Sequence, residues 1–294
     1  MKAIKARIME RLTNIRFNLI LVLASLFVFW PIMLMILEGF DIDLSPIFSG
    51  QGTRIVGGVP YYSGGILPTT VHYVDALVLA HFPKLALNST IIALLSVSIA
   101  LAVGIPSGYG LARLKFKGQE AIAFLLLALR TVSPFAIILP LFILYTQNGL
   151  WDTYIGLAVA YLVIDVPVVV WVLRGLFTEI PREVYDAAEV FGASETQIFR
   201  KIAIPTILLG IVATAIFAFV LLWNEFLIAN LLTGPATKTV SVGIWAGLGE
   251  SSGFRSISFD DLNVAGTLAL IPALTILLII KRYLARGFTL ATAS

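Results

Sequence analysis

A few charged and hydrogen-bonding side chains interrupt long apolar runs in this sequence, and they are the first candidates for chemistry. Arg130 and Asp165 each lie well inside such a run, and Trp223, Asn224 and Glu225 interrupt another. A charge at the centre of a bilayer costs about 2.5–3.5 kcal/mol on insertion scales, so such a residue is by default paired or functional. Because Arg130 and Asp165 are expected at matching depths, they either neutralise each other or line a transport path.

The Trp223-Asn224-Glu225 group allows two interpretations. The ring face of a tryptophan packs on sugar C–H groups, and an asparagine amide both donates and accepts hydrogen bonds, so the group suits a sugar. It equally suits an interfacial aromatic residue and a hydrogen bond between helices. The candidate residues of a translocation path are therefore Trp223, Asn224, Glu225, Arg130 and Asp165.

A second polar feature is the stretch 179–205, which places eight charges between two apolar runs. The pattern predicts a hairpin of two short helices outside the bilayer. Pro181 suits a first helical turn, where its missing N–H would have no partner. Gly192 can adopt the left-handed conformation that ends a helix. Ser194, followed three residues later by Gln197, forms a capping-box pattern for the second helix, which is predicted to stop before Pro205.

The apolar residues of the first helix recur at helical spacing and share one face. They are Val184, Ala187, Ala188 and Phe191. The charged residues take the other face. On these residues alone, the hairpin could simply rest on a membrane surface.

The composition is that of a polytopic membrane protein. Hydrophobic residues make up 59% and charged residues 13%, against about 45–50% and about 25% in ordinary globular chains. The mean hydropathy is +0.97. There is no cysteine, which excludes disulfides, thiolate metal sites and thiol redox chemistry. His72 and His81 lack the spacing of a helical metal pair, so no metal site is expected.

The sequence has neither the phosphate-binding pattern G-x-x-x-x-G-K-[ST] nor H-E-x-x-H. We therefore expect no catalytic residue, no bound cofactor and no nucleic-acid partner.

The apolar runs predict an all-α protein with six transmembrane helices. They lie at about 17–37, 85–112, 121–145, 154–177, 204–232 and 262–283. The first run is too long for a signal peptide and has no cleavage site after it, so it is expected to be retained. The expected divisions are a basic N-terminus at 1–16, the first helix, an extracytoplasmic loop at 38–84, a core of five helices at 85–283 and a tail at 284–294.

The basic residues are distributed unevenly between the loops. Of the 20 Lys and Arg residues, 15 lie at the N-terminus, in the turn after the second run, around the hairpin and in the tail. Four lie in the other loops, and Arg130 lies within the third run. By the positive-inside rule, both termini and the hairpin are expected in the cytoplasm.

The hairpin resembles the signature loop of ABC-importer permeases. That pattern runs acid-Ala-Ala, three residues, Gly, nine residues, Ile, one residue, Leu-Pro. This chain has Asp186-Ala187-Ala188, Gly192, Ile202 and Ile204-Pro205, with Asp186 in place of Glu and Ile204 in place of Leu. In that family the loop is the coupling helix, which docks in a groove of a separate ATPase subunit.

The resemblance implies a set of ATPase-coupling residues, which comprises Glu183, Asp186, Ala187, Ala188, Gly192, Ala193, Phe199, Ile202 and Pro205. It also implies a cell-membrane (plasma or inner) complex. Its other members would be a second permease subunit, two ATP-binding-cassette ATPase subunits that carry ATP and Mg, and an extracytoplasmic sugar-binding protein.

Further segments resemble the carbohydrate-uptake branch of the family, specifically the second permease of maltose-type importers, over roughly residues 85–286. They include Arg130–Pro134, Leu139–Leu141, Asn148–Tyr154, Trp223–Leu227 and Lys238–Gly243. This implies import of a mono- or oligosaccharide such as a glucose-like or maltose-like sugar. In the family, the loop at 233–261 reaches into the sugar-binding protein. The tail begins like the family's, with Arg286–Thr289, but lacks its Gly-rich ending.

Two other classes of protein are compatible with the composition. An ion-coupled secondary transporter would use a membrane carboxylate such as Asp165 or Glu225, but it needs no docking hairpin, and no inverted repeat is visible. An intramembrane enzyme would need a nucleophile and a base at bilayer depth. Deletion of residues 182–202 separates these classes, because only the importer has an ATPase to lose.

Overall fold

The computed structural model describes residues 2–40, 54–56, 59–61, 73, 77, 81–131, 133–247, 263–272 and 274–275. The chain forms two compact units. One comprises Met1–His81 with Gly247–Ile271, and the other comprises Phe82–Ala246 with Pro272–Ser294. The tail at 284–294, most of the loop at 38–84 and the end of the sixth predicted helix lie outside the described residues.

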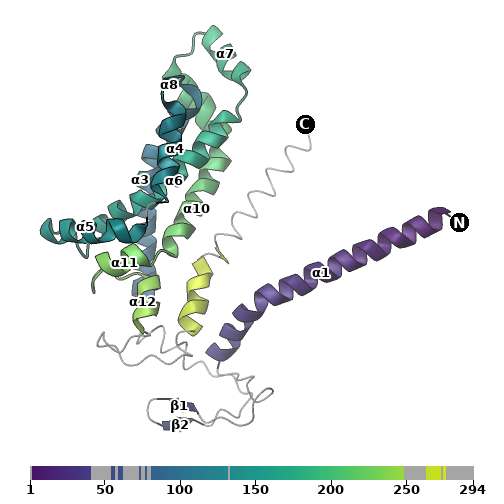
Figure 1. The fold of residues 1–294 in the computed structure, drawn as a ribbon, viewed down its shortest axis with the longest axis vertical. Helices are drawn as coiled ribbons and strands as arrows, with labels where there is room; N and C mark the ends of the chain where they lie inside the picture. Colours follow the sequence, from purple (N-terminus) through teal and green to yellow (C-terminus); the bar gives the residue numbers. More distant parts are fainter. Residues whose placement is uncertain are drawn as a thin grey trace. The chain divides into compact units, whose positions relative to one another are not determined.

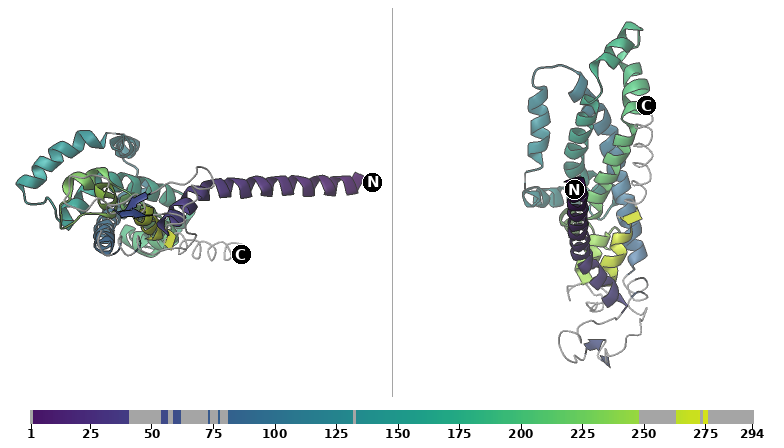
Figure 2. Two further views of the ribbon diagram at one scale, coloured as in Figure 1. Left: turned by 90° about the horizontal axis from the view of Figure 1, so that it is seen from below. Right: turned by 90° about the vertical axis from the view of Figure 1, so that its right-hand side faces the viewer.

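The first unit contains α1, Lys2–Gly39, whose apolar part Phe17–Gly39 is long enough to cross a membrane. The helix also includes the basic N-terminal residues from Lys2 onward. Figures 1 and 2 show a bend toward its C-terminal end, the part that contains Pro31. A proline inside a helix removes one backbone hydrogen bond and commonly causes such a bend.

The end of α1 packs on the helix Asn263–Pro272 within this unit. The Asn263 amide donates a 2.6 Å hydrogen bond to the Glu38 carboxylate. A Cβ atom at Gly39 would come within 2.9 Å of Val264, and one at Gly266 within 2.5 Å of Met35. Small residues on both helices therefore permit their close approach.

A two-stranded antiparallel hairpin in the first unit departs from the predicted all-α fold. Its strands are β1, Arg54–Val56, and β2, Val59–Tyr61, paired with Arg54 opposite Tyr61. In the sequence, Gly57-Gly58 separates two short runs that contain β-branched residues, which is a hairpin signal. The prediction missed it because 38–84 was treated only as a loop.

Two long helices form the centre of the second unit. They are α3, Phe82–Arg113, and α6, Tyr154–Thr178, close to the predicted helices 85–112 and 154–177. A Cβ atom at Gly104 would meet the Val169 side chain at 2.5 Å, and one at Gly108 would meet Leu173 at 3.0 Å. Glycines on α3 thus let the two backbones approach closely. Figure 1 shows α10, Leu208–Trp223, running alongside this pair.

The third predicted helix, 121–145, is wrong as a single element. It consists of α4, Gln119–Leu129, and α5, Pro134–Gln147, with a break between them. Pro134 starts α5, and Ser133 before it has the extended ψ of 126° that a following proline favours. Figures 1 and 2 show α4 running along the long helices, whereas Figure 1 shows α5 lying across them. An ion pair between Arg174 and Glu120 ties α4 to α6.

The fifth predicted helix, 204–232, is also divided. Its parts are α9, Ile204–Thr206, then α10, and α11, Leu227–Leu232. The helical segments Glu195–Thr206 and Leu208–Trp223 meet at 71°. Beyond α11 lies α12, Val240–Gly247.

Among the described residues, three helices are long and apolar enough to cross a membrane, or four if the bent pair forms one span. The shorter apolar helices are Gln119–Leu129, Phe135–Gln147 and Asn263–Pro272. A count of six spans stays a prediction.

Candidate coupling hairpin and membrane site

The first helix of the hairpin is α7, Arg182–Val190. Pro181 was predicted in its first turn, but it lies one residue earlier, at the N-cap, where its ψ of 140° is not helical. It ends through Gly192, whose φ is +80°, in the left-handed region. The Gly192 N–H donates to the Glu189 carbonyl at 2.9 Å, and the Ala193 N–H donates to the Ala188 carbonyl at 3.0 Å. These bonds satisfy carbonyl groups in the last turn of the helix, as is common where a helix ends at a glycine.

The capping box of the second helix is confirmed. This helix, α8, spans Glu195–Ile198. The Ser194 N–H donates to the Gln197 side-chain oxygen at 2.9 Å, and the Gln197 N–H donates to the Ser194 hydroxyl at 3.4 Å. Gly192 and this pair of hydrogen bonds together reverse the direction of the chain between α7 and α8, using only local interactions.

The prediction that the second helix stops before Pro205 is wrong. A π-helical turn, Phe199–Ala203, continues α8 and leads into α9, which contains Pro205. Proline is tolerated in the first turn of a helix because its missing N–H is not needed there. The chain bends only after Thr206, at Ile207.

An aromatic cluster centred on Tyr109 of α3 fastens the hairpin to the membrane helices. The Tyr109 hydroxyl donates a 2.6 Å hydrogen bond to the Glu195 carboxylate of α8. Its ring lies 4.8 Å from Phe199, 5.3 Å from Phe177 and 6.4 Å from Tyr185, measured between ring centroids. The cluster therefore joins α3, α6 and both arms of the hairpin.

Arg113 at the end of α3 adds an electrostatic attachment. Its guanidinium forms an ion pair with Glu189 of α7 and lies 4.7 Å from the centre of the Tyr185 ring. The Tyr185 side chain is buried, and burial raises the pKa of its hydroxyl, an effect that Arg113 partly opposes. The hairpin is thus held by packing, a hydrogen bond and an ion pair rather than by the loop alone.

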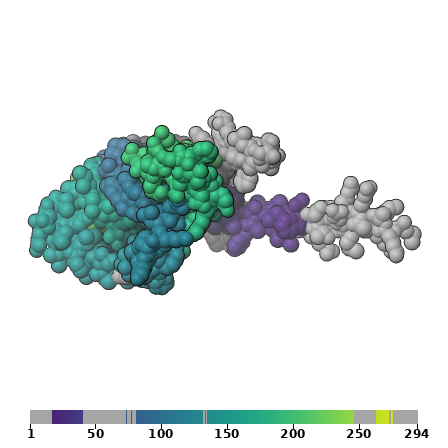
Figure 3. Space-filling model, turned by 90° about the horizontal axis from the view of Figure 1, so that it is seen from above, coloured from purple at the N-terminus to yellow at the C-terminus, as the bar shows by residue number. Residues whose placement is uncertain are grey.

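The outward side of the hairpin is apolar and exposed. Phe191 is 89% exposed, Val190 86% and Val184 41%. Ala188 is buried. The apolar face that was predicted for α7 is therefore divided between an inner, buried side and an outer, exposed side. Figure 3 views this end of the second unit, where the green hairpin lies at the surface beside the blue end of α3. Large apolar side chains exposed among charges are typical of a docking surface.

Arg130 and Asp165 differ sharply in environment. Arg130 caps α4 at the break before α5 and is exposed, whereas Asp165 of α6 is fully buried. Among the described residues no ion pair joins them, in contrast to Arg113 and Glu189. Within the described part of the chain, the Asp165 oxygens and the neighbouring Ser96 hydroxyl of α3 have no hydrogen-bond partner at normal geometry.

Each residue of the Trp223-Asn224-Glu225 group has a partner nearby in the sequence. Trp223 is buried, and its ring stacks on Phe219 with 5.9 Å between centroids. The Glu225 carboxylate accepts hydrogen bonds from the Ile228 and Ala229 N–H groups at 3.0 and 3.1 Å. It thereby satisfies the free amides at the start of α11.

Asn224, the third residue of the group, is exposed at the break between α10 and α11. Its side chain donates to the Val220 carbonyl at 2.8 Å. Because Trp223 is buried and Glu225 is partly buried, Asn224 is the member of the group most available to a ligand.

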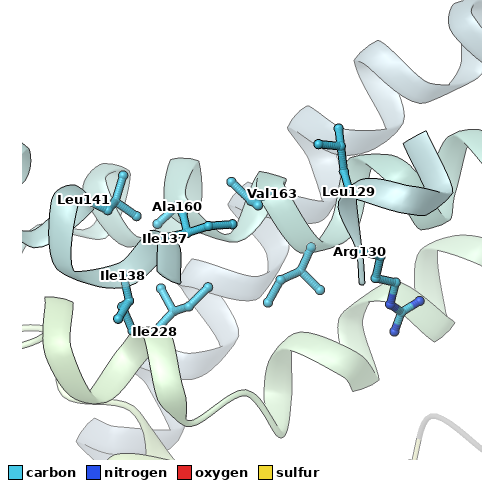
Figure 4. A pocket seen from close by; sticks show the side chains of 9 residues that line it. Leu129, Arg130, Ile137, Ile138, Leu141, Ala160, Val163 and Ile228 are labelled. Atoms are coloured by element: carbon cyan, nitrogen blue, oxygen red, sulfur yellow. The ribbon is translucent and has the colours of Figure 1, made fainter. Parts of the chain in front are cut away.

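A small apolar cavity lies beside the break between α4 and α5 (Figure 4). It is bounded by α4, α5, α6 and α11, and its volume is about 50 Å³. Its lining consists of Leu129, Arg130, Ile137, Ile138, Leu141, Ala160, Val163, Ile164 and Ile228. Arg130 is the one charged residue of this lining, and Figure 4 shows its guanidinium extending away from the apolar walls.

The prediction overlooked a cluster of hydrogen bonds around Asp152, in the turn between α5 and α6, here named the Asp152 knot. The Asp152 carboxylate accepts four hydrogen bonds from Gly234, Ala236 and Thr237, more than 80 residues later. A carboxylate directly before the helix-capping Thr153 could have signalled a structural role. Its partners could not be read from the sequence because they are not local.

The described residues contain no group of three or more His, Cys, Asp or Glu side chains that could hold a metal ion.

Sequence comparison finds relatives among transport proteins. The chain is 30% identical to the trehalose transport system permease protein SugB of Mycobacterium tuberculosis, over 77% of this chain and 83% of that protein. It is 28% identical to the trehalose/maltose transport system permease protein MalG of Thermococcus litoralis, over 91% and 92%.

The fold is similar to a chain of a bacterial ABC transporter involved in the import of the acidic polysaccharide alginate. The TM-score is 0.68 at 16% identity, over 93% of this chain and 96% of that chain. At this identity the likeness concerns the fold.

Residues 100–290 match a family described as binding-protein-dependent transport system inner membrane component. This range covers the hairpin, its anchoring residue Tyr109 and the Asp152 knot. The apolar helices agree with a multi-pass location in the membrane. The chain belongs to the family of inner membrane components of binding-protein-dependent transport systems.

Proposed function

We propose that this chain is one permease subunit of an ATP-driven, binding-protein-dependent sugar importer. It spans the membrane six times with both termini in the cytoplasm. A second permease subunit completes the translocation pathway, two ATPase subunits bind ATP and Mg, and an extracytoplasmic protein delivers the sugar. The chain itself is not an enzyme.

The exposed apolar face of the hairpin carries this proposal. Phe191 and Val190 are almost fully exposed at the tip of a structure whose other side is anchored by Tyr109 and Arg113. Solvent exposure of two large apolar side chains is unfavourable, and a groove in a partner protein would remove them from water. The coupling residues proposed from the sequence, from Glu183 to Pro205, lie on this hairpin.

The anchoring also suggests how the hairpin transmits force. Because Tyr109 and Arg113 join it to the end of α3, a displacement of the hairpin is passed to α3 and to α6 packed against it. Two ATPase states can drive this displacement only if they bind the hairpin with different affinity. The helices would then alternate between inward and outward openings.

The sugar class rests on the relatives. SugB and MalG are described as trehalose and trehalose/maltose permeases, and two others as permeases for diacetylchitobiose and sulfoquinovosyl glycerol. We propose that Asn224 and Arg130, both exposed beside helix breaks, face the translocation path. Asp165, Trp223 and Glu225 would lie behind the residues that line this path and hold them in position.

The test is co-purification from the native membrane. The wild-type chain should bring with it an ATPase subunit, a second permease and a binding protein, whose bound sugar mass spectrometry can identify. The double variant Val190→Ser with Phe191→Ser should lose the ATPase but keep the second permease.

Leu114→Ser is the matched control, since Leu114 is 50% exposed in the turn after α3 but lies off the hairpin. The control should retain the ATPase. Recovery of the wild-type chain without any ATPase subunit would contradict the proposal and favour an ion-coupled secondary transporter.

A further inference from the structure

The Asp152 carboxylate organises a segment on the side of the second unit opposite the hairpin. One oxygen accepts from the Gly234 N–H at 2.8 Å, the Thr237 N–H at 2.9 Å and the Thr237 hydroxyl at 2.6 Å. The other accepts from the Ala236 N–H at 3.1 Å. Hydrogen bonds to a charged acceptor are stronger than neutral ones, so four on one carboxylate make a firm attachment.

The local backbone is built to present this carboxylate. Asp152 has a φ of +55°, which is uncommon for a residue other than glycine. Its own N–H donates to the Leu232 carbonyl at 3.0 Å, and the Trp151 indole donates to the Leu231 carbonyl at 3.2 Å. The turn between α5 and α6 therefore grips the end of α11 as well as the segment after it.

Polar residues of α3 grip the same segment from another direction. The Asn88 amide donates to the Ala236 and Lys238 carbonyls, both at 3.0 Å. The Tyr154 hydroxyl donates to the Asn88 oxygen at 2.7 Å, which fixes the orientation of that amide. Residues 231–240, here named the outer strap, are thus bound by side chains to α3 and to the α5–α6 turn.

The far end of the outer strap returns to the break between α10 and α11. The Ser89 hydroxyl accepts from the Val240 N–H at 2.9 Å. The Ser241 hydroxyl, at the start of α12, donates to the Glu225 carbonyl at 2.6 Å. The Glu225 carboxylate caps the start of α11, and α11 leads into the strap. Both ends of the strap are therefore connected to the break between α10 and α11.

We propose that Asp152 is a positioning residue that fixes the outer strap for the binding protein, so that docking there moves α11 together with α5 and α6. This inference rests on the proposed importer function. Most of the strap belongs to the loop at 233–261, which the family resemblance predicts to reach the binding protein. A strap detached from Asp152 would absorb the docking motion in its own backbone instead of passing it to the break at Glu225.

Two substitutions should weaken the contact between Asp152 and the outer strap, one on each partner. Asp152→Asn keeps the shape of the side chain but places an amide donor where one carboxylate oxygen accepts. Gly234→Ala inserts a Cβ atom 2.6 Å from an Asp152 oxygen and 2.8 Å from the Trp151 ring. Gly175→Ala is the matched control, because a Cβ atom at Gly175 of α6 meets nothing within 4 Å.

The experiment measures ATPase activity of the purified complex in nanodiscs against the concentration of the binding protein recovered with it, loaded with its own sugar. Asp152→Asn and Gly234→Ala should each raise the half-maximal concentration about tenfold and leave the basal rate unchanged. The double variant should be no worse than Asp152→Asn alone, since Gly234→Ala acts on a contact that Asp152→Asn already weakens. Gly175→Ala should match the wild type.

A parallel loss of basal rate and of stimulation, or half-maximal concentrations equal to that of the wild type, would overturn the inference. Thr237→Val, which removes only the hydroxyl donor, provides a milder test if the other variants assemble poorly, and it should shift the half-maximal concentration in the same direction. Failure of the wild-type complex to hydrolyse ATP, or to respond to the binding protein, would instead refute the importer function itself.

Discussion

The Tyr109 hydroxyl of α3 donates a 2.6 Å hydrogen bond to the carboxylate of Glu195, 86 residues further along the chain, in the second helix of the hairpin. This bond joins a helix that is long and apolar enough to cross a membrane to the charged hairpin. In the proposed function, a displacement of the hairpin reaches the membrane helices through these two residues.

Removing the Tyr109 hydroxyl should weaken this joint without dismantling it. Tyr109→Phe keeps the ring cluster and loses the bond to a charged acceptor, which should cost about 1–2 kcal/mol. The thermal unfolding midpoint of the purified complex should fall, and ATP-dependent uptake should fall with it. Tyr185→Phe is the control, because the Tyr185 hydroxyl is buried without a hydrogen-bond partner among the described residues. Its loss should be neutral or stabilising, and equal effects of the two changes would contradict the assignment.

Gly192→Ala should destabilise the hairpin for a conformational reason alone. Gly192 has a φ of +80°, and an added Cβ atom would meet nothing within 4 Å. The left-handed conformation costs an alanine about 1–2 kcal/mol, and Gly192→Asn should cost less. Gly175→Ala, an equally open position within α6, should instead stabilise by about 0.5–1 kcal/mol. Thermal unfolding of the three variants checks the sign of each effect, and the same sign for both alanines would contradict this account.

Gly104 and Val169 should show a strong energetic coupling at the seam between α3 and α6. Gly104→Ala places a Cβ atom 2.5 Å from a Val169 methyl group, and such overpacking typically costs about 1–3 kcal/mol. Val169→Ala alone leaves a cavity, because Val169 is fully buried. The double variant should be more stable than the sum of the single effects predicts. A double-mutant cycle of thermal stabilities measures this coupling, and strict additivity would mean that the helices simply move apart.

The stabilising effect of Asp152 should depend on pH in a defined direction. Burial tends to raise the pKa of Asp152, but its four hydrogen bonds outweigh burial and hold the pKa below the usual 3.8. A group whose pKa is lower in the folded state stabilises the fold above its unfolded pKa and loses this effect as the pH falls through the folded value. The stability advantage of the wild type over Asp152→Asn should therefore be constant from about pH 5 to 8 and shrink below about pH 4. Thermal unfolding across this range measures the advantage, and one that grows on acidification would contradict the role of the carboxylate.

Features that depend on local interactions were predictable. The helices around Gly104 and Asp165 follow from unbroken apolar runs, and the structure ends them within a few residues of the prediction. The reversal at Gly192 and the Ser194–Gln197 capping box involve residues at most five apart, so the sequence pattern contains the whole interaction.

The helix breaks were not predictable from the same information. A proline in an apolar run is compatible with a kink, as at Pro31, or with a change of direction, as at Pro134. Packing against other helices decides between them, because it must compensate the backbone groups that the break releases. The depth argument that paired Arg130 with Asp165 assumed a continuous third helix, and the break at Arg130 removes that assumption.

The sequence by itself therefore determined a membrane-embedded helical chain, the family signature and the hairpin that carries it, since hydropathy, spacing and capping are local properties. Only the tertiary structure decided what holds the hairpin and the outer strap. Tyr109, Asp152 and Asn88 bind partners more than 80 residues away. Such partners are chosen by the packing of helices in three dimensions, which no short stretch of the chain encodes.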